Sequence, residues 1–167
     1  MTYIRPEAPG DEDAIHRLTA DAFAPMAYAD GTEPDIIRRL RETGDLTLSL
    51  VADEDGEIVG HVAFSPVTID GVHDAWFGLG PISVRADRQR QGIGTRLVAE
   101  GLAVLEARGA KGCALLGDPQ VYASMGFASD GALRYRDVET RFVQRIVLRG
   151  APPGGELGFA PAFGDAA

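Results

Sequence analysis

The fold of this chain is decided by the segment Gln89-Arg90-Gln91-Gly92-Ile93-Gly94-Thr95, which follows an apolar run, Pro81–Val84, and opens a helical pattern. Glycine has no Cβ, so backbone N–H groups at a helix start can converge there on an anion. The helix dipole and four arginines between positions 85 and 96 add to that attraction, against one acid, Asp87. The segment is therefore predicted to be a phosphate-binding turn, with a solvated strand-to-helix turn as the alternative.

Two other phosphate-binding loops are excluded by their residues. A dinucleotide-binding loop needs a third glycine, and counting from Gly92 its position is held by Leu97. A P-loop needs Gly-Lys followed by Ser or Thr, whereas Lys111 is followed by Gly112-Cys113. The turn therefore belongs to a different class of anion site.

Outward from the turn, strand and helix patterns follow one another without repeats. A strand is predicted at 2–5, followed by helices that begin near Asp11 and Thr32. Asp11 is expected to cap the first helix, and Thr32 with Asp35 to form a capping box on the second, which ends at Gly44. A hairpin turning at Asp55-Gly56 comes next. The remaining expected elements are a strand at 75–84, a helix at 94–108, a strand at 113–116, a brief helix at 121–125 and strands at 133–135, 142–148 and 156–160. This order predicts a mixed α/β sandwich rather than a run of βα units.

Composition limits the classes of function. With 167 residues and 45% hydrophobic content, the chain is expected to form one domain over 1–167, ending in a tail rich in Gly, Pro and Ala at 150–167. A net charge of −9 argues against nucleic-acid or anionic-membrane partners. The single cysteine, Cys113, cannot form an internal disulfide, and no residues have metal-ligand spacing. Without a signal-peptide pattern or a long apolar run, a cytoplasmic location is expected and no metal cofactor.

The motif Gln89-x-x-Gly92-x-Gly94, with its preceding strand and following helix, resembles the signature of the GCN5-related N-acetyltransferase (GNAT) superfamily. The later segment Tyr122–Phe127 is similar to that family's Tyr-x-x-x-Gly-Phe, and the resemblance extends over nearly the whole chain. Leu116–Pro119 and Pro161–Phe163 look most like the YhbS-like branch.

This resemblance implies a mixed, mostly antiparallel sheet flanked by helices, with splayed central strands, that binds acetyl-CoA as cosubstrate. The interrupted run Gly78-Leu79-Gly80-Pro81 gives a physical reason for the splay, because proline cannot donate to a strand ladder. By resemblance, the pantetheine arm bonds to the strand backbone and the pyrophosphate to the amides of the turn. The implied coenzyme-binding residues are Ile82, Ser83 and Val84 on the strand and Arg90, Gln91, Gly92, Ile93, Gly94 and Thr95 in the turn.

The implied reaction is direct acetyl transfer to a primary amine of a small molecule or a protein. Tyr122 matches the family's general acid, with packing under the cleft as its alternative role. Residues 77–80 carry no carboxylate for the base; Asp118 is a candidate that could equally cap the next helix. Glu33 lies where the family shapes its acceptor pocket, and could equally be a first-turn acid favoured by the dipole.

Several alternatives stay open at this point. An acyl-CoA-binding sensor module without activity would share the fold and the turn. Cys113 lies in an apolar strand and is expected to be inert, and the three histidines are expected to be solvated or in the core. The protein is expected to be a monomer or a homodimer. The loop 26–31, expected to help set the acceptor, contains no recognisable chemistry.

Overall fold

The structure is a computed structural model that describes residues 1–26 and 29–164. Two positions of the expected acceptor loop, 27 and 28, and the last three of the predicted tail lie outside the described residues. The chain forms two compact units, each made of two separate stretches. The first comprises Met1–Phe64 and Gly80–Gly101, and the second comprises Ser65–Leu79 and Leu102–Ala167. The expectation of one domain stays a prediction.

Antiparallel strands form the sheet of the first unit. β1 (Thr2–Pro6) pairs with β2 (Leu48–Glu54), and β2 pairs with β3 (Glu57–Pro66). β5 (Trp76–Val84) follows in the strand order, and the Arg85 N–H at its end donates to the Val59 carbonyl at 2.8 Å. The predicted hairpin turn is confirmed, because Asp55 and Gly56 have φ angles of 53° and 91°, the left-handed pair of a two-residue hairpin loop.

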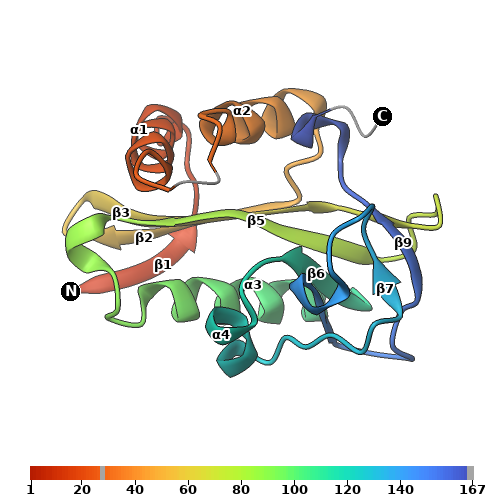
Figure 1. The fold of residues 1–167 in the computed structure, drawn as a ribbon. Coiled ribbons are helices and arrows are strands. Elements are labelled where there is room, and N and C mark those ends of the chain that lie inside the picture. Colours follow the sequence, from red (N-terminus) through yellow and green to blue (C-terminus); the bar gives the residue numbers. More distant parts are fainter. Residues whose placement is uncertain (27–28, 165–167) are drawn as a thin grey trace. The chain divides into compact units, whose positions relative to one another are not determined.

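Helices cover both faces of this sheet (Figure 1). α1 (Glu12–Phe23) and α2 (Glu33–Thr43) pack Ile15 and Ile37 on Val51 of β2. The next residue, Ala52, points to the opposite face, where α3 (Ile93–Ala107) lies. A Cβ at Gly60 of β3 would meet Ile93 and Leu97 of α3 at 3.0 and 3.1 Å, so this glycine permits their close contact.

Two of the expected helix caps are wrong. The Asp11 carboxylate does not cap α1 but accepts from the Arg5 guanidinium at 2.8 Å and from the Ala8 N–H at 2.7 Å. Thr32 makes no side-chain cap either; its hydroxyl donates to Asp30. A charged partner from a neighbouring strand competes successfully with a local cap for Asp11, because charge-assisted hydrogen bonds are stronger. The predicted stop at Gly44 is confirmed by its φ of 81°.

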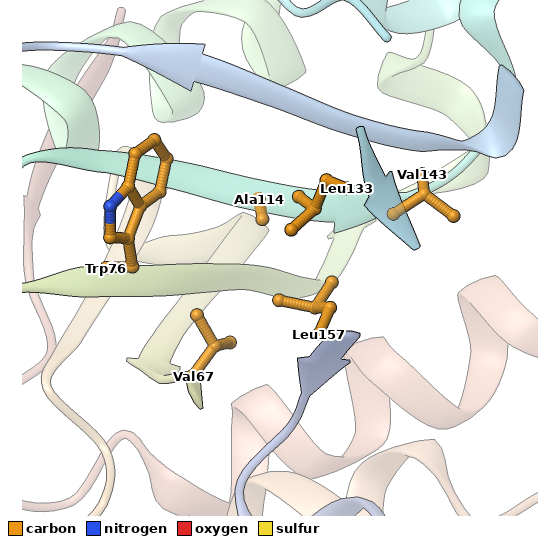
Figure 2. Packing of buried hydrophobic residues seen from close by; sticks show 6 residues of the cluster. All are labelled: Val67, Trp76, Ala114, Leu133, Val143 and Leu157. Atoms are coloured by element: carbon orange, nitrogen blue, oxygen red, sulfur yellow. The ribbon is translucent and has the colours of Figure 1, made fainter. Parts of the chain in front are cut away.

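The second unit holds the start of β5 and the C-terminal strands. Residues Trp76–Gly78 of β5 (Trp76–Val84) pair in parallel with β6 (Gly112–Leu116), which pairs antiparallel with β8 (Val143–Val147). A second sheet has the order β4-β9-β7. Figure 2 shows the side chains that fill this unit's core. They are Val67, Trp76, Ala114, Leu133, Val143 and Leu157.

The short elements complete the description. β9 (Gly155–Gly158) confirms the expected last strand, whereas β4 (Thr68–Ile69) was not expected. The other short elements are β7 (Leu133–Arg134), α4 (Pro119–Tyr122) and four 3-10 helices, η1 (Ala86–Arg88), η2 (Ala123–Met125), η3 (Thr140–Phe142) and η4 (Pro161–Phe163).

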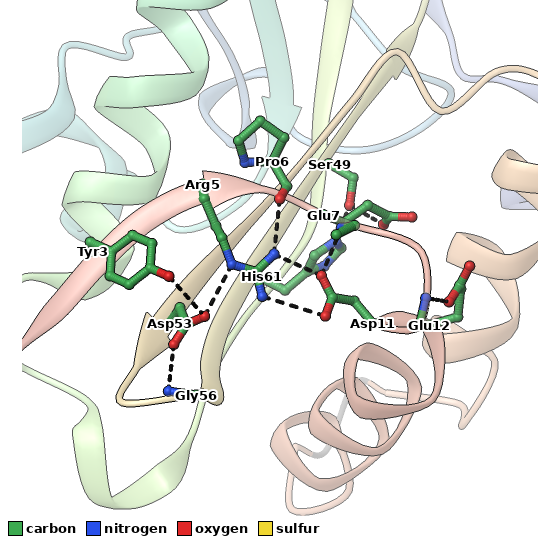
Figure 3. Close-up of polar contacts among 12 residues, drawn as sticks. Tyr3, Arg5, Pro6, Glu7, Asp11, Glu12, Ser49, Asp53, Gly56 and His61 are labelled. Carbon is green, nitrogen blue, oxygen red and sulfur yellow. Dashed lines mark hydrogen bonds and ion pairs between the residues drawn. The ribbon is translucent and has the colours of Figure 1, made fainter.

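A buried polar chain crosses the first unit (Figure 3). Arg41 of α2 makes two 3.0 Å hydrogen bonds to the Glu7 carboxylate, which contacts the Ser49 hydroxyl. Ser49 Oγ lies 2.8 Å from His61 Nε2. Because serine has one proton and the neighbouring carboxylate attracts it, His61 must supply the N–H in its own contact. His61 is fully buried, and this desolvation lowers its pKa to about 4.

His61 therefore makes unfolding easier in acid. Its folded pKa lies below the unfolded value of about 6.5, so the unfolded state binds more protons between those values and stability falls as pH falls. We expect this residue to account for about 3 kcal/mol of lost unfolding free energy between pH 7 and pH 4. The His61→Gln variant keeps an N–H for Ser49 but does not titrate, so its unfolding free energy should fall less. Urea unfolding followed by circular dichroism measures both proteins. The exposed His16→Gln variant is the control, and equal pH slopes for wild type and His61→Gln would contradict the prediction.

Candidate functional site

The predicted phosphate-binding turn lies between β5 and α3. The side chain of Gln89 holds it closed, because its Nε2 donates to the Val84 carbonyl at 3.1 Å. Arg90 and Gly92 have left-handed φ angles of 63° and 84°. Left-handed residues curve successive backbone N–H groups toward one side, which is how anion-binding concavities form in proteins. For Arg90 this conformation is uncommon and strained, so the turn is a specialised one.

The start of α3 supplies further donors. The Arg96 N–H donates to the Gly92 carbonyl at 3.0 Å, which is the first bond of the helical ladder. The N–H groups of Ile93, Gly94 and Thr95 precede it and have no earlier helical carbonyl to bind. A Cβ at Gly94 would have Val84 as its nearest neighbour, at 3.8 Å, so the protein itself leaves room above this residue. Backbone donors at the positive end of a 15-residue helix suit an anion, so the predicted phosphate-binding role of this turn stays a prediction.

Arginines contribute less to this site than the sequence indicated. Arg85 is paired with Asp87 at 2.7 Å and Glu57 at 2.9 Å, and Arg88 with Glu54 at 2.7 Å. The Arg88 guanidinium lowers the pKa of Glu54 to about 2. The charges of these two guanidinium groups are therefore balanced by carboxylates of the protein and contribute less to attracting an anion. Arg90 is exposed and, among the described residues, makes no ion pair, so its charge stays available to an anion.

β5 loses its parallel partner before it reaches the turn. Its register with β6 runs from Trp76↔Gly112 to Gly78↔Ala114, although β5 continues to Val84 and β6 to Leu116. The predicted coenzyme-binding residues Ile82, Ser83 and Val84 all follow this point. Ser83 is buried, and its hydroxyl has no hydrogen-bond partner in the described part of the chain. The early end of the ladder agrees with the splay implied by the family resemblance.

Tyr122 and Asp118 both lie in the second unit. Tyr122 ends α4, is half-buried and meets the Phe127 ring edge-on at 6.1 Å. A Cβ at Gly117 would lie 2.6 Å from its ring, so glycine makes room for this tyrosine. The Asp118 Oδ1 accepts from the Gln120 N–H at 2.9 Å, so the alternative role as the cap of α4 is confirmed. The catalytic roles of both residues stay predictions.

The other reactive side chains have structural surroundings. Cys113 is fully buried, and burial raises the pKa of its thiol far above its usual range, which leaves it protonated. His73 contacts the Val67 carbonyl at 3.0 Å and packs edge-on against Phe77. Over the described ranges, no group of three or more His, Cys, Asp or Glu side chains could hold a metal ion. No helix in the described part of the chain is long and apolar enough to cross a membrane.

Sequence reasoning missed one functional contact in the turn. Gln89 is part of the predicted motif, but its hydrogen bond to the Val84 carbonyl was not expected. The sequence signal for this contact was a glutamine side chain directly before the turn, because a side-chain N–H₂ group can donate to a nearby backbone carbonyl.

Comparison with known proteins supports one family. Residues 13–129 match the Acetyltransferase (GNAT) family. The chain is 39% identical over 125 residues to YhbS of Escherichia coli K12, described as an uncharacterized N-acetyltransferase; the match covers 74% of this chain and 72% of that one. A GNAT family acetyltransferase from Brucella melitensis, solved in complex with acetyl-CoA, has 42% identity and a TM-score of 0.89 over 98% of this chain and 99% of its own. The E. coli YhbS structure in complex with CoA has a TM-score of 0.88 at 33% identity, over 97% and 91%.

Glycine at position 92 should be needed for anion binding more than for folding. In Gly92→Ala the new Cβ would meet no protein atom within 4 Å, but it would stand on a residue with left-handed φ. Gly44→Ala, at the end of α2, has the same free space and nearly the same φ, so it is the matched control. Both variants should lose about 1–2 kcal/mol of unfolding free energy. Only Gly92→Ala should weaken acetyl-CoA binding, by about tenfold or more, because the backbone can no longer approach the pyrophosphate. Titration calorimetry together with urea unfolding separates the two effects.

A second variant removes backbone strain from the test. Gly94→Val fills the room above α3 at a residue with ordinary helical φ, so it should also weaken acetyl-CoA binding while the fold survives. Normal acetyl-CoA binding by both Gly92→Ala and Gly94→Val would show that the turn is not the coenzyme site.

Proposed function

Since the chain belongs to the Acetyltransferase (GNAT) family, we propose that it transfers an acetyl group from acetyl-CoA directly to a primary amine of a small molecule or a protein. The observation that carries the proposal is the turn 89–95, where left-handed Arg90 and Gly92 lead into the N–H groups at the start of α3. Such a turn suits a diphosphate, whose oxygens accept several hydrogen bonds at once.

Acetyl-CoA is the proposed cosubstrate. In this assignment the turn amides bind the pyrophosphate, and the backbone of Ile82 to Val84 binds the amides of the pantetheine arm. The early end of the β5–β6 ladder supports the second part, because strand groups without a ladder partner can bond to a ligand. The Brucella relative, 42% identical over nearly its whole length, was solved with acetyl-CoA. No metal is needed for this chemistry.

The reaction balances without any further reagent. The amine nitrogen attacks the thioester carbonyl and forms a tetrahedral oxyanion, and the carbon–sulfur bond then breaks as the amide forms. The departing thiolate takes a proton, in our assignment from the Tyr122 hydroxyl, whose ordinary pKa is about 10. The amine loses one proton to a base or to water. Asp118 stays the proposed base, although one of its oxygens is occupied by the Gln120 N–H.

Tyr122→Phe tests the acid role. The variant keeps the ring that packs on Phe127 and Gly117 but has no proton to donate. We expect kcat to fall about 100-fold or more, with acetyl-CoA affinity unchanged within about twofold. Release of the coenzyme thiol is followed with a thiol-reactive dye over a panel of amines; buried Cys113 should not react in the folded protein. Tyr135→Phe, in the same unit, is the matched control and should keep full activity.

One observation favours a second candidate, an acyl-CoA sensor without catalysis. β5 carries no carboxylate at 77–80, where the family often places its base. Tight acetyl-CoA binding without turnover of any amine, in wild type as in Tyr122→Phe, would support the sensor. A monomeric or homodimeric state, a cytoplasmic location and the lack of nucleic-acid or membrane partners stay predictions.

A further inference from the structure

A small cavity opens where α1 ends and α2 begins, in the first unit. Its volume is about 180 Å³, below the roughly 300–1,000 Å³ of a pocket that encloses a whole ligand. Its walls include Ala20, Phe23 and Ala24 from the last turn of α1 and Pro34 from the first turn of α2. Glu33 is its one charged lining residue among those described. The cavity therefore suits one end of a ligand, with an apolar stem and a charged or polar head.

The Glu33 carboxylate is incompletely bonded in this cavity. Its Oε2 accepts from the Asp30 N–H at 3.4 Å, which is a long contact. Its Oε1 is buried and, in the described part of the chain, has no hydrogen-bond partner. A buried carboxylate oxygen without a donor is costly. The start of α2 stabilises the negative charge but supplies no proton donor to Oε1. A ligand N–H donor would complete the site.

The local charge selects a cation. Between Arg17 and Arg38 the sequence holds four carboxylates and no Lys, Arg or His. Of these, Asp35 is paired with Arg38 at 3.1 Å. The last turn of α1, which carries no basic residue, places the negative end of its dipole at the cavity wall. An ammonium group meets these requirements, since it is compact, positively charged and carries three donors.

The ammonium group that binds Glu33 should not be the amine that attacks the thioester, but a second amino group of the same acceptor. A carboxylate beside an amine stabilises its protonated form and raises its pKa, whereas attack on a thioester needs the neutral amine. A substrate with two amino groups avoids the conflict, because one is held protonated by Glu33 and the other is free to lose its proton. Resting on the proposed function, we propose that the acceptor is a small aliphatic diamine or polyamine whose non-reacting ammonium binds Glu33.

A series of α,ω-diaminoalkanes tests this, with n-alkylamines of the same length as controls. Wild type should prefer the best diamine to its matched monoamine by about tenfold or more in kcat/KM. Glu33→Gln keeps the acceptor for the Asp30 N–H but has no charge. It should lose that preference mainly through a higher KM for the diamine. Asp35→Asn is the control, because Asp35 also lies in the first turn of α2 but is already paired with Arg38. This variant should keep the preference for the diamine.

Binding distinguishes a failure of this proposal from a failure of the proposed function. Calorimetry with CoA-saturated protein should detect the diamine in wild type and about tenfold weaker binding in Glu33→Gln. Diamine binding that depends on Glu33 without any acetyl transfer would overturn the catalytic function and leave the cation site standing. Turnover of monoamines and diamines at equal rates, or equal diamine binding by wild type and Glu33→Gln, would overturn the cation site. A preference for lysine-containing peptides over every free diamine would also overturn it, in favour of a protein acceptor.

Discussion

The close packing of α3 against β3 is the constraint on which the turn depends. A Cβ at Gly60 would stand about 3 Å from Ile93 and Leu97, and one at Gly101 would overlap the Phe64 ring at 2.3 Å. Two glycines, one on a strand and one on the helix, thus let helix and sheet approach within direct contact. Ile93 is both the first residue of α3 and a buried anchor. The N–H groups that follow it are therefore held by the core, and a preformed donor array needs little ordering when an anion binds.

The turn is predicted to bind an anion although the chain carries a net charge of −9. Two of the four neighbouring guanidinium groups are already matched, with Arg85 paired to Glu57 and Asp87 and Arg88 paired to Glu54. The carboxylates paired with Arg85 are exposed, and those pairs contribute little to stability. The Arg88–Glu54 pair is half-buried, and Glu54 and Glu57 connect the turn to the β2–β3 hairpin. Attraction must then come mainly from backbone dipoles, which act at short range and with fixed direction. Such a site selects by geometry, and a surface that is acidic elsewhere limits nonspecific anion binding.

Sequence patterns predicted the elements that depend on local chemistry. The Asp55-Gly56 turn, the stop at Gly44 and the glycine motif all require left-handed or closely approached backbone, which few residues allow. The failures involve partners that lie outside the helix or turn whose pattern was used for the prediction. Asp11 was expected to cap α1, but Arg5 and the Ala8 N–H take its carboxylate. Likewise, all four arginines near the turn were expected to attract an anion, but Glu57 and Glu54 pair with Arg85 and Arg88 once the hairpin has folded. Asp118 shows the opposite case, where the local cap prevailed.

Catalytic assignments were less predictable than the coenzyme turn for a physical reason. A phosphate site made of backbone N–H groups leaves a trace in glycine spacing, whereas an acceptor pocket is made of side chains whose burial sequence does not reveal. Glu33 illustrates this, because its place in the first turn of α2 has an ordinary dipole explanation. Only the fold shows that one of its oxygens is buried without a donor beside apolar walls. A carboxylate oxygen that is buried without a donor offers an interaction that a cationic ligand can complete.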